Sequence, residues 1–405
     1  MDFIAQLNGT VKHYDWGGYS FIPSLLNTPN DSKIPFAEYW LGVHPQADCK
    51  VILANGETRS LGDYFTTCSP TALGDYVARR FETLPYLLKA LDIQDMLSIQ
   101  VHPSKANAVD DFLEENNKGI ALDSPVRNYK DDNHKPELMV AMGDFWLLHG
   151  FKPAEELTKT LKMVPELSAL LPVFVQSGYE GLYKTAMELS QEKVNTQLQP
   201  LLDRIIPLYK EGKLNRSQAD YWAAKGALAF SQPGKLDRGI FSVYFFNLVE
   251  LHRGEAIFQD AGVPHAYLEG QNIEIMASSD NVLRGGLTKK HIDVPELLKH
   301  VKCEATHPRV LKGEKAGAEH IYKTPAPDFE LSSFALHDGD SVSFVPNTAD
   351  ILLLVDGHVE ISHKKQKVIL EKGQPSAIVF PGNEVRLSAT GPSWLFKGTV
   401  PVAKG

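Results

Sequence analysis

Hydrophobic and polar residues alternate along much of residues 1–150, which is the pattern of half-buried β-strands. The alternation is visible at 48–57 (DCKVILANGE), where Asn55-Gly56 is a hairpin-type dipeptide. A second short β-rich run, MLSIQVHP, covers 96–103. Residues 104–119 (SKANAVDDFLEENNKG) predict a helix. This part of the chain is therefore expected to be mainly strands and turns.

Residues 153–230 have a different composition, rich in Leu, Ala, Lys, Glu and Gln. Their apolar residues recur at spacings of three and four, as in Val194, Leu198, Leu201, Ile205 and Leu208. We expect the prolines to divide this stretch into several short helices, because proline removes a backbone donor; they are Pro165, Pro200 and Pro207. The pattern predicts a helical insertion over residues 153–238.

The strand pattern is expected to resume at Gly239 and to dominate after about residue 320. Short strands separated by Gly and Pro favour a sandwich or jelly roll. Residues 251–265 and 370–385 also share a weak repeat, a Gly turn followed by a β-rich run and a second Gly. The repeat resembles a cupin jelly roll used twice, although two unrelated hairpins could share it by chance.

In this alignment the two copies differ at one chemically important place. The first copy has His265 just past its second Gly, where the second copy has Glu384 and Val385. We therefore predict a mainly β fold with two cupin-like domains and a helical insertion. The first domain comprises 1–152 and 239–320, the insertion 153–238, and a C-terminal domain without metal 321–405.

Composition narrows the classes of partner. The 405 residues carry a formal charge of −9, which argues against nucleic acid or an anionic membrane as the main partner. A locally basic site for a small anion remains compatible with that charge. The sequence has no secretory signal pattern and no run of about 18 apolar residues. Three separated cysteines indicate reduced thiols, so we expect a cytoplasmic protein.

Four residues from three predicted strands could bind one metal ion. Gln100 and His102 lie two apart on a strand and share a face. Glu137 begins an apolar run, and His265 follows a Gly-Val-Pro turn. Each has an ordinary structural explanation alone, respectively a polar strand end, a salt bridge and a structural histidine. Together they form an N/O donor set suited to Zn²⁺.

A basic segment lies close by in the sequence. Residues 272–298 contain Asp280, Arg284, Lys289 and Lys290, and two glycines after Arg284 allow the chain to turn. A solvated basic loop is the simpler interpretation of this segment taken alone.

Several long motifs resemble the type I phosphomannose isomerase family, which belongs to the cupins. The motifs occur in the family's order through the N-terminal two-thirds of the chain: Trp16-Gly17-Gly18, AEYWLGVHP (37–45), LPYLLKALDIQDMLSIQVHPSK (84–105), YKDDNHKPELMVAM (129–142), GVPHAYLEG (262–270) and SSDNVLRGGLTKKHIDVPELL (278–298). The helical insertion and the C-terminal part resemble the family only in length and texture.

The resemblance implies an enzyme that interconverts mannose 6-phosphate and fructose 6-phosphate through a cis-enediol(ate). It implies one Zn²⁺ per chain, held by the same four residues, Gln100, His102, Glu137 and His265. It also implies that Arg284 is essential. The family often has Pro where this chain has Lys289, so Lys290 is the better match to the family lysine. The state of assembly is expected to be a monomer or a weak homo-oligomer.

The general acid/base stays open among Lys135, His134 and Asp280, although a neighbouring cation would favour the neutral amine of Lys135. Candidates for holding the phosphate are Ser98, Lys105 and Lys290. Trp16 is a candidate for covering the sugar face, or else an ordinary core tryptophan.

Three other functions fit part of the pattern. A cupin iron oxygenase would use two His and one Glu, but Gln100 and the basic segment favour the isomerase. A sugar-phosphate-binding protein without catalysis would not need Arg284 with all four ligands. A bifunctional isomerase–nucleotidyltransferase would need a Gly-rich nucleotide-binding start, which the sequence lacks. Whether the enzyme serves biosynthesis of mannose donors such as GDP-mannose or catabolism is not decided.

Overall fold

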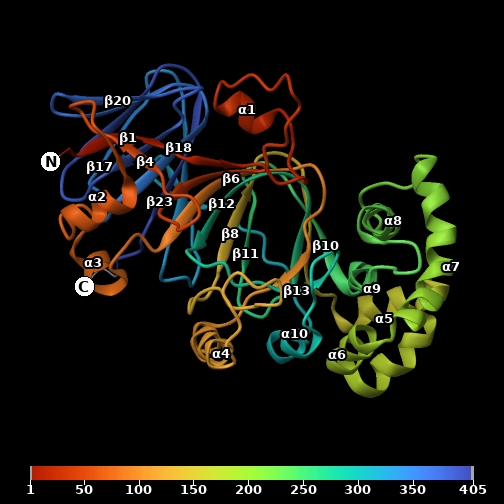
Figure 1. Cartoon of the computed structure of the whole chain (residues 1–405). Coiled ribbons are helices and arrows are strands. Elements are labelled where there is room, and N and C mark those ends of the chain that lie inside the picture. Colours follow the sequence, from red (N-terminus) through yellow and green to blue (C-terminus); the bar gives the residue numbers. More distant parts are fainter. Residues whose placement is uncertain (1, 403–405) are drawn as a thin grey trace.

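The computed structural model describes residues 2–402, and its architecture is mainly β with helices. Three sheets form the β part, and helices α5–α9 lie together at one end of the molecule, away from both chain ends (Figure 1). The predicted fold class is thereby confirmed.

The central sheet has ten strands and is organised around the long strand β12. β12 pairs with β7 and β9 through its first half and with β6 and β8 through its second half. The strands of this sheet are β2 (Thr10–Lys12), β3 (Glu38–Gly42), β6 (Tyr86–Ile93), β7 (Ile99–Val101), β8 (Glu137–Ala141), β9 (Phe145–Phe151), β10 (Phe246–Leu251), β11 (Ala256–Gln259), β12 (His265–Ala277) and β13 (Leu283–Gly286). One strand therefore brings distant segments of the chain to the same place.

Two further sheets pack face to face in the C-terminal part, around an apolar cluster that includes Leu352, Ile361 and Leu387. The first runs, in spatial order, β14 (Glu314–Ala316), β15 (Glu319–Tyr322), β16 (Glu330–Leu336), β23 (Ser393–Thr399), β18 (Asp350–Asp356), β21 (Ser376–Val379), β1 (Ile4–Asn8), β4 (Lys50–Ile52) and β5 (Thr58–Ser60). The second runs β17 (Ser341–Phe344), β22 (Val385–Ala389), β19 (Val359–His363) and β20 (Gln366–Leu370).

The N-terminal strand β1 lies inside the sheet of the C-terminal part. Its residues pair antiparallel with β21, for example Ile4 with Val379, and with β4 on the other side. The predicted hairpin at 48–57 is confirmed as β4–β5, which extends the same sheet. The two β regions thus share strands, and the predicted division of the chain into domains stays a prediction.

Eleven helical segments occur within residues 2–402: α1 (Phe21–Leu25), α2 (Leu61–Cys68), α3 (Asp75–Phe81), α4 (Lys105–Asn117), α5 (Ala154–Met163), η1 (Pro165–Leu170), α6 (Leu171–Glu188), α7 (Gln191–Lys210), α8 (Ala219–Phe230), α9 (Gly239–Phe245) and α10 (Val294–His300). The predicted helix at 104–119 is α4. None of these helices is both long and apolar enough to cross a lipid bilayer.

The prediction that Pro200 and Pro207 end helices was wrong. Both lie inside the single helix α7, whereas Pro165 does separate α5 from η1. A proline inside a helix costs ~3 kcal/mol or more. The apolar face of α7 buries Val194, Leu198 and Ile205 among its contacts, and this burial offsets the lost hydrogen bonds.

The prediction that strands resume at Gly239 was also wrong, because residues 239–245 form helix α9 and the strand begins at Phe246. All seven residues of α9 are buried. A helix that is apolar on every side has no amphipathic period, so its β-branched and aromatic composition resembles that of a buried strand.

We predict that Val385→Ala affects stability alone. The Val385 side chain is fully buried in the apolar cluster between the two C-terminal sheets. Removing two methyl groups there should lower the free energy of unfolding by roughly 1–3 kcal/mol. Differential scanning calorimetry should show a lower unfolding temperature, with activity and bound metal per chain unchanged.

The matched control is Val345→Ala, because Val345 is 53% exposed in the same part of the chain. Its effect should stay within about 0.5 kcal/mol. Equal stability of the two variants, or loss of a second bound metal in Val385→Ala, would contradict the prediction.

Candidate metal centre

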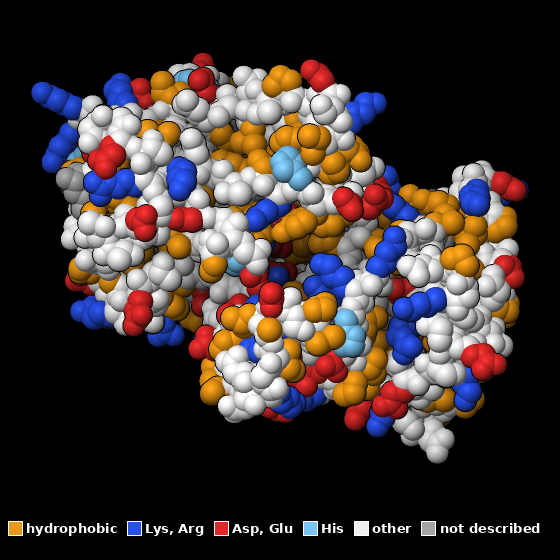
Figure 2. Space-filling view, viewed as in Figure 1, with side chains coloured by type: hydrophobic (Ala, Val, Ile, Leu, Met, Phe, Trp, Pro, Cys, Tyr) orange, Lys and Arg blue, Asp and Glu red, His pale blue; other side chains and the backbone are white. Residues whose placement is uncertain are grey.

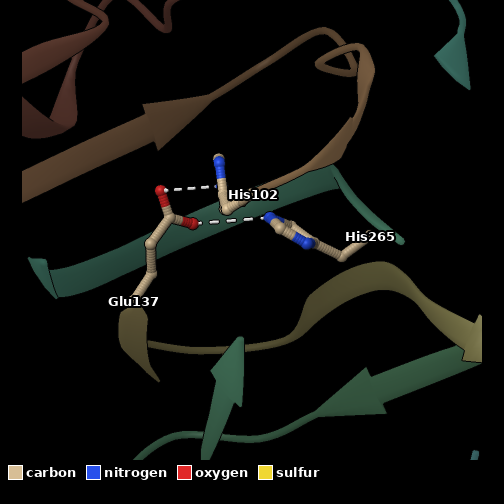
Figure 3. Close-up of side chains that lie close together, drawn as sticks. All are labelled: His102, Glu137 and His265. Atoms are coloured by element: carbon tan, nitrogen blue, oxygen red, sulfur yellow. Dashed lines mark ion pairs between the residues drawn. The ribbon is translucent and has the colours of Figure 1, made fainter. Parts of the chain in front are cut away.

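Three buried side chains converge in the central sheet. His102 directly follows β7, Glu137 begins β8 and His265 begins β12. The Nε2 atoms of His102 and His265 lie 3.4 Å from Oε1 and Oε2 of Glu137, respectively. Figure 3 shows the carboxylate with one oxygen turned toward each imidazole ring. The ligand atoms of the three residues lie within 4.8 Å of one another.

The hydrogen bonds of the two histidines determine which ring nitrogen is protonated. Nδ1 of His102 lies 2.9 Å from the carbonyl oxygen of Asn281, and Nδ1 of His265 lies 3.0 Å from that of Val263. A carbonyl can only accept, so each Nδ1 carries the proton and donates it. In the neutral rings each Nε2 therefore presents a lone pair to the carboxylate.

A bound cation would satisfy the two Nε2 atoms and the carboxylate, all of which are acceptors. Nε2 of His102 is buried and has no hydrogen-bond partner. Burial lowers the pKa of His102 to about 4, so the ring is neutral near pH 7. Burial by itself would raise the pKa of Glu137, but the neighbouring ammonium of Lys135 opposes it, and that pKa lies well below its usual range. Two neutral imidazoles and one carboxylate fit a zinc ion, with their Nδ1–H groups oriented by carbonyls.

Gly262 and Asn281 hold the backbone around the two histidines in place. Gly262 has φ +80 and its N–H donates to the carbonyl of His102, which joins the turn before His265 to the other histidine. A Cβ there would lie 2.8 Å from Cγ of Lys302, so glycine is required. Asn281 presents its carbonyl to His102 while its side chain bonds the backbone of Lys130, Asp131 and Asn133.

The pairing of three neighbouring strands determines where Gln100 and Arg284 lie relative to this cluster. On β7, Gln100 pairs with His265 of β12 on one side and with Arg284 of β13 on the other. Residues directly opposite one another across antiparallel strands project from the same face. Gln100 and Arg284 therefore lie on the face that carries His265. Arg284 is half-buried, and burial lowers its pKa.

The three candidates for acid/base chemistry occupy different surroundings. Nζ of Lys135 lies 3.2 Å from Oε1 of Glu137, within the metal-ligating cluster. His134 instead contacts Asp328, with Nε2 2.8 Å from the carboxylate. Asp280 lies 3.4 Å from Nε2 of His44.

The predicted substrate-binding residues are dispersed around the centre. Trp16 is partly buried against the apolar cluster of Leu91 and Tyr267 and stacks on Tyr14 at 5.7 Å. Ser98 is half-buried, at the position before β7. Lys105 donates to the carbonyl of Asp132 and the amide oxygen of Asn133. Lys290 is largely exposed on the segment after β13, and partial burial of its amine and nearby Arg284 lower its pKa.

Sequence reasoning missed a buried lysine and its carboxylate partners in the central sheet. Nζ of Lys89 lies 3.4 Å from Glu274 and 3.7 Å from Glu38, and 4.6 Å from the ring of Trp40. Burial would lower the pKa of Lys89, but the carboxylates outweigh it and raise that pKa. Burial and nearby Glu137 raise the pKa of Glu274 to about 7. The available signal was a lysine within the apolar run LPYLLKALDI, where a charge needs partners.

Comparison with known proteins agrees with this geometry. Residues 4–154 match the model of the family described as phosphomannose isomerase type I, catalytic domain. The mannose-6-phosphate isomerases of Salmonella typhimurium and Escherichia coli are each 36% identical to the chain, covering 96% of it and 98% of their own length. The human mannose-6-phosphate isomerase is 31% identical, covering 96% of each chain.

The chain belongs to the type I phosphomannose isomerase family.

Solved structures of phosphomannose isomerases share the whole fold. The Salmonella typhimurium enzyme bound to fructose 6-phosphate and zinc superposes with a TM-score of 0.87 at 32% identity, covering 99% of this chain and all of that one. Another mannose 6-phosphate isomerase, described as holo and zinc bound, has a TM-score of 0.86. Alanine variants of one histidine, one glutamate, one lysine and one arginine of the Salmonella phosphomannose isomerase are also among these structures.

We predict that His102→Ala and His265→Ala each lose the bound metal. Removing one imidazole leaves two of the three converging side chains, and the affinity should fall by more than the about 10–100-fold that loss of an outer hydrogen bond costs. Metal content after dialysis against a weak chelator, measured by plasma mass spectrometry, checks this. His307→Ala is the control, because His307 is exposed and lies outside the groups of described residues that could hold a metal. Full metal content in either ligand variant would refute the assignment.

Proposed function

We propose that this chain is a zinc-dependent aldose–ketose isomerase that interconverts mannose 6-phosphate and fructose 6-phosphate. The observation that carries the proposal is the pair of imidazole Nε2 atoms turned toward the buried Glu137 carboxylate, an arrangement of acceptors that a bound metal ion would satisfy. Family membership and the zinc-bound and fructose 6-phosphate-bound structures support the metal and the substrate. Gln100 is proposed as the fourth ligand because it projects from the same face as His265.

The reaction moves two protons and no net electrons. One proton leaves C2 and one arrives at C1, while the hydroxyl proton on O2 passes to O1. The intermediate between these transfers is a cis-enediol(ate). Zinc, when bound, supplies a Lewis acid that stabilises the negative charge developing on the sugar oxygens.

The chain's own residues have two tasks in this reaction. Lys135 is our choice for the group that takes the proton from C2 and returns it to C1, since its amine lies in the metal-ligating cluster. His134 contacts Asp328, and Asp280 contacts His44. We assign His134 and Asp280 to positioning the loops around the site. The permanent charge of Arg284 stabilises the developing oxyanion from another side.

The substrate phosphate is proposed to contact Ser98, Lys105 and Lys290, and Trp16 to cover the sugar. The catalytic domain is proposed to comprise 1–152 and 239–320, with 153–238 a helical insertion and 321–405 a cupin-like domain without metal. In support of the last assignment, Glu384 is exposed and Val385 faces the apolar cluster. A cytoplasmic monomer or weak homo-oligomer stays a prediction.

The direct test is turnover of mannose 6-phosphate by the purified zinc-loaded protein. We expect fructose 6-phosphate to form, as measured in an assay coupled to glucose-6-phosphate isomerase and glucose-6-phosphate dehydrogenase. Chelation should abolish the activity and added zinc should restore it. Purified protein that holds iron and consumes oxygen, or zinc-loaded protein without turnover, would refute the proposal.

We predict that Lys135→Met lowers kcat by about 10²–10⁴-fold, the usual contribution of an acid/base group, with metal content retained. Exchange of the C2 proton into deuterated solvent should fall equally when followed by NMR. Asp280→Asn and His134→Ala serve as comparisons and should retain more exchange than Lys135→Met. Retained exchange in Lys135→Met with its loss in Asp280→Asn would move the assignment to Asp280.

A further inference from the structure

A cavity of about 350 Å³ lies away from the metal-ligating side chains. It is formed where the beginning of α7, the end of α8 and the residues leading into α9 meet the segment after β13. Of the residues assigned above to the metal, the substrate or catalysis, Lys290 alone lines it. Its size is within the range of small-molecule pockets.

The cavity is lined by five basic side chains: Lys235, Arg238, Lys289, Lys290 and His291. Within residues 2–402, none of the four Lys and Arg residues among them forms an ion pair. Most are exposed, and Arg238 is half-buried. Figure 2 shows Lys and Arg side chains gathered along the boundary between the β part and the helices, where this cavity lies. On a chain with formal charge −9, unpaired cations converging on one cavity point to an anionic ligand.

The cavity's acidic residue, Asp237, does not neutralise these cations. Its Oδ1 accepts hydrogen bonds from the N–H groups of Gly239 and Leu287, at 2.7 and 2.8 Å. Its Oδ2 accepts from the N–H of Thr288 at 3.1 Å. The carboxylate is buried and holds the start of α9 against the segment after β13. It shapes the pocket and forms no ion pair with the lysines, while Arg238 donates to the carbonyl of Met187.

The remaining wall is apolar, formed by Phe230, Leu236, Ile292 and Val294. A bare inorganic anion would satisfy the cations but would leave this wall and most of the volume unused. We propose that the pocket is a second binding site, separate from the metal centre, for a phosphate monoester that carries a flat, weakly polar ring, such as a nucleoside monophosphate. The phosphate contacts Lys235 and Lys289, and the ring packs on the apolar wall.

The pocket is joined to the metal centre through one strand. Arg284 on β13 projects beside Gln100 and His265, and the chain continues directly from β13 into the segment that carries Lys289 and Lys290. A ligand that orders this segment therefore affects the position of Lys290. Binding at this site is expected to change KM for the sugar phosphate more than kcat.

The test measures binding of AMP to the metal-loaded protein by isothermal titration calorimetry, with and without saturating fructose 6-phosphate. AMP should bind in both conditions, more weakly at high salt, because exposed cations are screened. Adenosine should not bind, and inorganic phosphate should bind more weakly than AMP. Lys235→Gln combined with Lys289→Gln should weaken AMP binding about tenfold or more, since two charge-assisted contacts are lost.

The matched control combines Lys162→Gln with Lys210→Gln, two exposed lysines on helices outside the cavity. It should bind AMP like the unmodified protein. Absence of AMP binding, equal affinity in both double variants, or displacement of AMP by fructose 6-phosphate would overturn the proposal. Displacement would show instead that the pocket holds the substrate's own phosphate. Because binding is read directly, the result is independent of whether the protein turns over mannose 6-phosphate.

Discussion

The arrangement of this molecule depends on one electrostatic constraint, the placement of two imidazole lone pairs opposite a buried carboxylate. His102, Glu137 and His265 all lie in the interior, where an uncompensated charge or acceptor is costly. Backbone carbonyls accept hydrogen bonds from the Nδ1–H groups of both rings, so the unprotonated Nε2 atoms face Glu137. His102, Glu137 and His265 would hold a divalent cation, which would supply the positive charge that this arrangement of acceptors lacks.

The other buried charges in the central sheet also have partners of opposite sign. Lys135 and Glu137 form one buried pair, and Lys89 with Glu38 and Glu274 forms another group deeper in the central sheet. Each of these charges has a partner of opposite sign nearby, which is the condition under which ionised groups persist in an interior. Toward the helices the pattern changes, because within residues 2–402 the lysines around the cavity beside α9 form no ion pairs. The anionic ligand proposed for the cavity would supply the missing opposite charge.

Several features were predictable because they are local. The hairpin at Asn55-Gly56, helix α4 and the return to strands in the C-terminal part follow from turn residues and periodicity. The two errors lie where packing outweighs local preference. Pro200 and Pro207 remain inside α7 because its apolar face is buried, and α9 is helical although every one of its residues is buried. In both cases the deciding contacts are with residues distant in the sequence.

The sequence by itself predicted four candidate ligands on β segments: a neutral amide, two imidazoles and a carboxylate. Its motifs determined the family, because long stretches of residues in order are specific. Only the tertiary structure decided that Gln100, His265 and Arg284 share one row across β12, β7 and β13, and that Lys135 rather than His134 reaches Glu137. Strand register and the partners of a buried charge depend on contacts between segments that are distant in the sequence. Local sequence patterns do not predict those contacts.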